Sequence, residues 1–165
     1  MKKTILMPAL LLCLALLLTA CGDAKKTEPA AAETPKPALT CAEFADLVQT
    51  AVGGAAMTDV NEKYLEKTLL IQATELSDWT FRRDGEGVTP EMILVLRVKD
   101  EKNLEAVKKA VQEYLEERTL QYRDYQPDQL YKLENAKVLE KDGMVALCVT
   151  ADAEKAANAL GEGWK

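Results

Sequence analysis

An apolar segment followed directly by a long amphipathic helix most constrains the fold of this chain. Residues 92–98 read MILVLRV, a run of apolar and β-branched residues typical of a buried central strand. Asp100 is expected to cap a helix over 101–122, in which mostly apolar side chains recur at steps of three and four. This stripe comprises Leu104, Val107, Val111, Tyr114, Leu115, Arg118 and Tyr122. The pattern predicts a layered domain in which helices cover a sheet.

The remaining elements follow from changes in the period of the apolar residues. A helix is expected over 41–52, because Thr40 and Glu43 have the spacing of a capping box and Gly53 and Gly54 end the pattern. Further helices are expected over 61–71, over 127–133 and over 152–160, the last ended by Gly161. Strands are expected over 79–83, 92–98, 136–140 and 144–149, with turns at 84–91 and 141–143.

The expected element order is therefore α-α-β-β-α-α-β-β-α. It predicts an α+β domain with a four-stranded antiparallel sheet, made of two hairpins, and helices packed mainly on one face. The helix over 101–122 is expected to pack across this sheet. Its core contacts would join Val107, Val111 and Leu115 to Leu94, Leu96, Leu147 and Val149.

The N-terminal segment resembles the export signal of bacterial lipoproteins. Lys2 and Lys3 precede a nearly uninterrupted apolar run, which ends in the lipobox-like sequence Leu18-Thr19-Ala20-Cys21. The resemblance implies that residues 1–20 are a signal peptide and that Cys21 is lipidated. The chain would then be anchored in the cell membrane at its extracytoplasmic face. An uncleaved transmembrane helix is the alternative, but the run is short for a span and contains Pro8.

Residues 21–40 are expected to be the lipidated cysteine and a disordered tether, which leaves 41–165 as a single domain. The tether is rich in Ala, Pro, Lys, Glu and Thr and nearly free of large apolar side chains. Removal of residues 1–20 removes two lysines and no acid. The 21 basic residues become 19 against 27 acidic ones, a net charge of −8. This charge disfavours nucleic acid as a partner.

Several catalytic systems are excluded by composition. The chain has no histidine, and its one serine, Ser77, has no nucleophile motif around it. The glycine pair at 53–54 lacks the lysine of a phosphate-binding loop. We therefore expect no catalytic residues, no metal site and no cofactor.

Cys41 and Cys148 are the thiols that remain once Cys21 is lipidated. Three interpretations are open. They could be two small buried side chains, a disulfide favoured by an exported compartment, or an activated thiol at the N-terminus of the first helix.

Two other clusters have alternative interpretations. The first cluster consists of four tyrosines: Tyr114, Tyr122, Tyr125 and Tyr131. They could line a groove for a sugar or peptide, although helical spacing also places Tyr114 and Tyr122 in the core. The segment 84–87 (DGEG) could be a weak calcium loop, but Asp-Gly is more typical of a hairpin turn.

The stretch from Met92 to Leu160 resembles the domain of unknown function family 4358 of predicted lipoproteins from Gram-positive bacteria. The resemblance lies in a strand ending in RVKD, the long charged helix, the segments 125–129 (YQPDQ) and 133–136 (LENA), and an apolar strand ending in Val149. It implies no activity and no site residues.

Together these features predict a non-catalytic surface lipoprotein whose domain binds a protein or ligand of the cell envelope. The alternative is a small-molecule-binding accessory lipoprotein associated with transport. A carboxylate-based envelope enzyme is the third class, and it would require two acids converging in a cleft.

Overall fold

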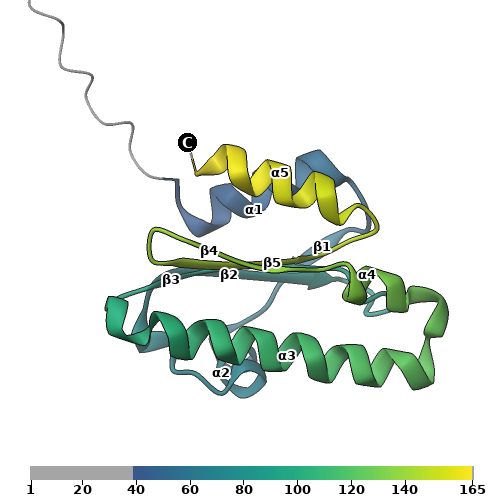
Figure 1. Ribbon diagram of the computed structural model, residues 1–165, viewed down its shortest axis with the longest axis horizontal. Coiled ribbons are helices and arrows are strands. Elements are labelled where there is room, and N and C mark those ends of the chain that lie inside the picture. The colour runs from purple at the N-terminus through teal and green to yellow at the C-terminus, as the bar shows by residue number, and fades with distance from the viewer. Residues whose placement is uncertain (1–38, 165) are drawn as a thin grey trace, which may run out of the picture. The chain divides into compact units, whose positions relative to one another are not determined.

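A five-stranded antiparallel sheet organises residues 39–164, the part of the chain that the computed structural model describes (Figure 1). The predictions for the signal peptide, for Cys21 and for most of the tether lie outside the described residues. The strand order is β1-β2-β3-β5-β4. The strands are β1 (Met57–Asp59), β2 (Leu76–Asp84), β3 (Met92–Val98), β4 (Val138–Lys141) and β5 (Met144–Val149).

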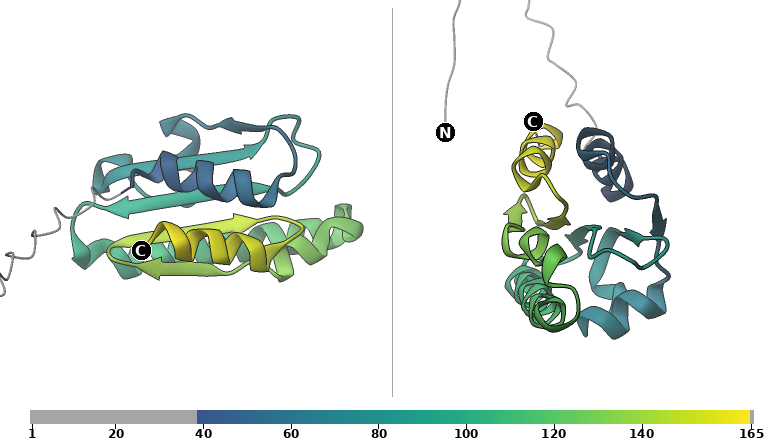
Figure 2. Two further views of the ribbon diagram at one scale, coloured as in Figure 1. Left: turned by 90° about the horizontal axis from the view of Figure 1, so that it is seen from above. Right: turned by 90° about the vertical axis from the view of Figure 1, so that its right-hand side faces the viewer.

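Helices cover both faces of this sheet. On one face α1 (Cys41–Val52) and α5 (Ala153–Gly163) lie side by side, and on the other lie α2 (Glu62–Leu69) and α3 (Leu104–Tyr125) (Figures 1 and 2). The short α4 (Leu130–Glu134) follows α3 along the chain. Single 3-10 turns precede β2, α3 and α4, at Ala73–Glu75, Glu101–Asn103 and Pro127–Gln129.

Alternation along the two central strands explains why both faces are covered. Successive side chains of a strand point to opposite faces, so an unbroken apolar strand needs apolar partners on each side. In β3, Leu94 and Leu96 join the core beneath α2 and α3, whereas Ile93 and Val95 join the core beneath α1 and α5. β5 divides its side chains in the same way.

The prediction of four strands with helices mainly on one face was therefore wrong in two respects. β1 lies between α1 and α2, where no strand was expected. It has three residues and gains its structure from pairing with Asp84, Arg83 and Arg82 of β2 rather than from an apolar pattern. The helices of the second layer, α1 and α5, were expected as elements, but their place on the opposite face was not, although the apolar character of both faces of β3 requires it.

The last helix runs past its predicted end. Gly161 lies within α5, which continues to Gly163. A Cβ atom at Gly163 would come within 2.5 Å of the Phe44 ring, and Trp164 packs on the same ring at 5.9 Å between centroids. Contact with α1 therefore holds an additional turn of α5 beyond the exposed Gly161.

Several local predictions are confirmed. Thr40 and Glu43 form a reciprocal capping box at the start of α1. β3 has the predicted bounds, and Asp142 and Gly143 both have positive φ angles, as a two-residue hairpin turn requires. In α3, Val107 and Val111 are buried in the predicted core, and Leu115 is half-buried against it.

The central position of Val111 gives a test of this packing. Val111→Ala removes two methyl groups from a fully buried site, so we expect the free energy of unfolding to fall by roughly 1–4 kcal/mol. Gln112→Ala, at the exposed neighbouring position, is the control and should change it by less than about 0.5 kcal/mol. Equal values for the two variants in denaturant titrations would contradict the assigned face of α3.

Candidate functional site

A pocket of about 200 Å³ lies where α2 and α3 meet the loop between β2 and β3. It opens into a shallower hollow of about 330 Å³ that shares three of its lining residues: Tyr64, Tyr114 and Arg118. We refer to the pocket and the hollow together as the α2–α3 cleft.

Helical and strand spacing bring the polar groups of this cleft together. Tyr114, Arg118 and Tyr122 recur every four residues, so they lie on one face of α3. Arg83 follows Phe81 by two positions in β2 and therefore faces the same side of the sheet, toward α2 and α3. Tyr64 comes from α2, and its ring packs edge-on against Phe81 at 5.9 Å between centroids.

The predicted tyrosine groove forms only in part. Tyr114 and Tyr122 are buried and line the pocket, as their place on the core stripe allows. Tyr125 and Tyr131 are 86% and 45% exposed and line no part of the cleft. Their place is taken by Tyr64, which the sequence analysis did not single out because it lies fifty residues earlier in the chain.

Two arginines that the sequence analysis did not identify as site residues rest on these tyrosines. The Arg118 guanidinium lies 4.9 Å from the centroid of the Tyr122 ring, and that of Arg83 lies 5.5 Å from the Tyr64 ring. Arg83 Nη1 also donates a hydrogen bond to Tyr64 Oη at 3.0 Å. Stacking on an aromatic face fixes the plane of each guanidinium.

Burial keeps the phenol of Tyr114 neutral. Loss of solvent raises the pKa of Tyr114 to about 12, although the positive charges of Arg118 and Arg83 act in the opposite direction. The Tyr114 hydroxyl is therefore protonated throughout the physiological pH range and can donate a hydrogen bond.

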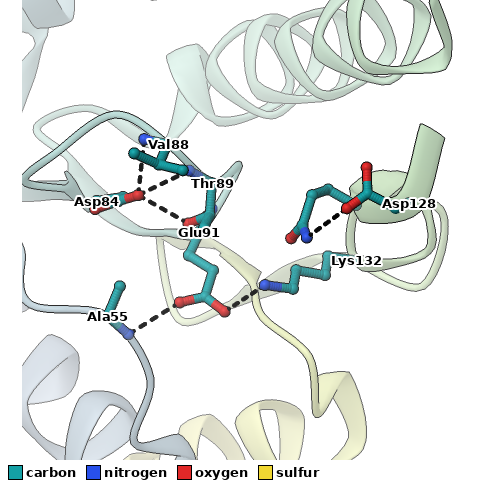
Figure 3. Close-up of polar contacts among 8 residues, drawn as sticks. Ala55, Asp84, Val88, Thr89, Glu91, Asp128 and Lys132 are labelled. Atoms are coloured by element: carbon teal, nitrogen blue, oxygen red, sulfur yellow. Dashed lines mark hydrogen bonds and ion pairs between the residues drawn. The ribbon is translucent and has the colours of Figure 1, made fainter. Parts of the chain in front are cut away.

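The loop at the mouth of the pocket is held by Asp84. Its Oδ2 atom accepts hydrogen bonds from the backbone amides of Val88 and Thr89, at 3.0 and 2.7 Å (Figure 3). Its Oδ1 atom accepts one from the backbone amide of Glu86 at 3.0 Å. These bonds, led by that from the Thr89 amide, lower the pKa of Asp84. The DGEG segment is thus a hairpin loop organised around a carboxylate, rather than a set of carboxylates available to a calcium ion.

A buried ion pair lies beside this loop. Lys132 Nζ of α4 is 2.8 Å from Glu91 Oε1, and both side chains are less than 10% exposed (Figure 3). Glu91 Oε2 accepts a hydrogen bond from the Ala55 amide at 3.1 Å. Glu91 therefore connects α4 to the segment after α1, and its charge is balanced within the protein.

The two cysteines lie in the core beneath α1 and α5, where both are free and buried. Burial, followed by the nearby Asp78 carboxylate, raises the pKa of Cys41 to about 12, and burial raises the pKa of Cys148 to about 12. An activated thiol requires the opposite shift. Loss of solvent therefore keeps the Cys41 thiol protonated at the start of α1.

A larger hollow of about 620 Å³ lies beside α5, and its twelve lining residues include four alanines and Cys148. Its charged residues Lys137, Asp152 and Glu154 are exposed to solvent, and Asp152 caps α5. The α2–α3 cleft is the better candidate because donors from three elements, α2, β2 and α3, converge there.

The described residues set two further limits. Between residues 39 and 164, no three or more acidic, cysteine or histidine side chains gather closely enough to hold a metal ion. Within the same range, no helix has the length and apolar character needed to cross a membrane.

Thiol counting separates the three interpretations of the cysteine pair. In full-length protein carrying Cys13→Ser and Cys21→Ser, we expect no reaction with Ellman's reagent at pH 8 in the native state, because on the order of one thiol in ten thousand is ionised there. Two thiols should react after unfolding in guanidinium. A disulfide would yield none after unfolding, and an activated thiol would react in the native protein.

Comparison with known proteins gives one relationship. The sequence profile described as "Domain of unknown function (DUF4358)" matches residues 51–150, from the end of α1 to the end of β5. The comparisons with curated proteins and with solved structures gave no match. The matched segment contains the whole sheet and the residues of the α2–α3 cleft, so the candidate site lies within the domain that the family shares. The chain belongs to the family of domains of unknown function DUF4358.

Proposed function

We propose that this protein is a lipid-anchored, non-catalytic binding protein of the cell envelope that holds a small ligand in the α2–α3 cleft. The observation that carries the proposal is the convergence of Arg83 and Arg118 with three tyrosines on one pocket. Small-molecule sites combine apolar and aromatic walls with a few fixed polar groups, and this lining has that composition.

The state of the nearby carboxylates favours binding over catalysis. Acid–base chemistry needs a carboxylate that can reach the substrate and exchange a proton with it. Asp84 is engaged by the backbone of its own loop, and Glu91 is paired with Lys132. The groups that remain available in the pocket are hydrogen-bond donors, which supports a binding site. A transport-associated accessory role is compatible with such a ligand.

A second candidate is the binding of an envelope protein. Its support is a set of exposed large side chains near the C-terminal end of α3 and on α4: Leu120, Tyr125 and Tyr131. Exposed tyrosines are common anchors of protein interfaces. This candidate uses a different surface from the cleft, so the two can be separated by mutation.

The anchor in this proposal is Cys21. Its support is the lipobox-like sequence that ends in Cys21, with the basic residues and the apolar run before it. Two acyl chains on one cysteine would give stable attachment to the membrane.

Replacement of the proposed lipid site tests the anchor. Cys21→Ser removes the sulfur that would carry the lipid, so we expect an unprocessed precursor and loss of palmitate labelling in cells. Cys13→Ser, inside the apolar run, is the matched control and should mature and be labelled normally. Normal maturation of the Cys21→Ser protein would contradict the proposed anchor.

Paired tyrosine variants test the cleft. Tyr64→Leu removes a ring and a hydroxyl from the pocket, so we expect full-length protein in uncharged detergent to retain envelope small molecules at least about tenfold less well, as measured by mass spectrometry. Tyr125→Leu, at an exposed position outside the pocket, is the control and should retain them normally.

Capture of proteins by cross-linking on intact cells is the complementary measurement. The cleft proposal predicts that Tyr125→Leu leaves ligand retention unchanged. Loss of a cross-linked protein in Tyr125→Leu and Tyr131→Leu cells, with no small molecule retained by the wild type, would favour the second candidate instead.

A further inference from the structure

We infer that the α2–α3 cleft recognises an oxyanion, the carboxylate or phosphate group of a small polar ligand, through Arg118 and Arg83. This inference rests on the proposed binding function and specifies the chemistry of its ligand. It follows from the hydrogen-bonding state of the two guanidinium groups.

Arg118 presents an unused donor edge. Its Nη1 atom donates to Gln121 Oε1 at 3.0 Å, which occupies one corner of the guanidinium. Its Nε atom is buried and has no hydrogen-bond partner among the described residues. Nε and Nη2 form the side of a guanidinium that carries two parallel N–H groups, and this side matches two oxygens of a carboxylate or phosphate.

An unsatisfied donor on a cation is uncommon inside a protein. Most buried polar atoms have a partner, because an unpaired one loses the hydrogen bond that water would have made. Stacking on Tyr122 holds the Arg118 guanidinium in place, so it does not depend on a hydrogen bond at Nε for its position. An oxyanion bound at the pocket would place an acceptor at this edge, with Nη2 reached directly and Nε after a small shift of the guanidinium, because Nε is covered as the side chain stands.

Arg83 provides a second cation at the same pocket. Gly87 lets the loop approach it closely, since a Cβ atom at this residue would lie 3.1 Å from Arg83 Nη2. Gly87 also has a φ of +69°, which other residues adopt rarely. Gly87 therefore lies close to Nη2 of the guanidinium, and Tyr64 Oη accepts a hydrogen bond from Nη1 at 3.0 Å.

Neither cation is neutralised by the protein. In the described part of the chain, no carboxylate lies within 4.0 Å of Arg83 or Arg118. The adjacent Arg82 differs, because it pairs with Asp46 at 2.6 Å and with Asp59 at 3.1 Å on the opposite face of the sheet. Two carboxylates line the same pocket, but Glu91 is balanced by Lys132 and Asp84 carries a single charge, so the two arginines leave the pocket locally positive in a chain with a net charge of −6.

The surrounding groups indicate a polar ligand. The Tyr64 hydroxyl accepts a bond from Arg83 and keeps its own proton for donation, and the neutral Tyr114 hydroxyl is a further donor. The hollow that continues from the pocket adds Lys67, Thr68, Glu117 and Gln121, and Glu117 Oε1 accepts a hydrogen bond from Gln121 Nε2 at 3.2 Å. We therefore assign the oxyanion to the pocket and a hydroxyl- or amide-bearing remainder to the hollow.

Anion titration followed by NMR tests this assignment. Full-length ¹⁵N-labelled protein in uncharged detergent is titrated with sodium phosphate and, separately, with sodium acetate, at constant ionic strength set with sodium chloride. We expect saturable shifts of the Arg118 and Arg83 Nε–H signals. Arg118→Gln should weaken binding at least about tenfold, as loss of a charge-assisted bidentate contact predicts.

Two other variants provide controls for charge and for folding. Arg123→Gln removes an exposed arginine from the next turn of α3 and should bind both anions as the wild type does. Arg118→Lys keeps the charge but not the two parallel donors, so its affinity should fall below that of the wild type. An amide spectrum that matches the wild type outside the cleft shows that each variant is folded.

The outcomes separate this inference from the proposed function. Linear shifts without saturation in the wild type, or equal anion affinity in the wild type and Arg118→Gln, would overturn oxyanion recognition. If Tyr64→Leu still abolishes retention of an uncharged envelope ligand, the cleft remains a binding site and only the ligand chemistry is wrong. Stronger binding of phosphate or of acetate identifies which oxyanion the pocket prefers, and either supports the inference.

Discussion

Burial of both faces of β3 and β5 is the constraint on which the rest of the structure depends. Their apolar side chains alternate between two cores, one beneath α2 and α3 and the other beneath α1 and α5. Neither core can form without its own helical layer, because a sheet with an uncovered apolar face would remain exposed to water. The pairing of Gly163 with Phe44 shows how closely α1 and α5 share one of these faces.

The same constraint creates the candidate site on the opposite face. α2 and α3 both pack on the sheet there, and the cleft forms between them where the β2–β3 loop closes one end. Asp84 and Glu91 hold this end in place through backbone hydrogen bonds and through the ion pair with Lys132. A buried pair of this kind contributes little net stability against an apolar alternative, but removal of one partner leaves a costly unpaired charge.

Much of this fold could be predicted from local sequence. The capping box at Thr40, the bounds of β3, the Asp142-Gly143 turn and the buried stripe of α3 all depend on interactions within a few residues or on simple periodicity. β1 could not be predicted, because three residues at a sheet edge take their conformation from the partner strand. The second helical layer was not predicted, because the sequences of α2 and α5 alone do not reveal which face of the sheet they cover.

The sequence by itself determined every element except β1, the acidic charge and the lack of histidine- and serine-based catalytic systems, because each is a property of residues near one another or of composition. The tertiary structure decided which polar groups meet. Tyr64, Arg83 and Arg118 come from three elements separated by up to 54 positions, and no local spacing marks them as neighbours. Conversely, Tyr114, Tyr122, Tyr125 and Tyr131 are close in sequence but differ in burial, since Tyr125 at the end of α3 and Tyr131 in α4 are exposed. Proximity along the chain sets conformation, whereas a site depends on which faces are packed together.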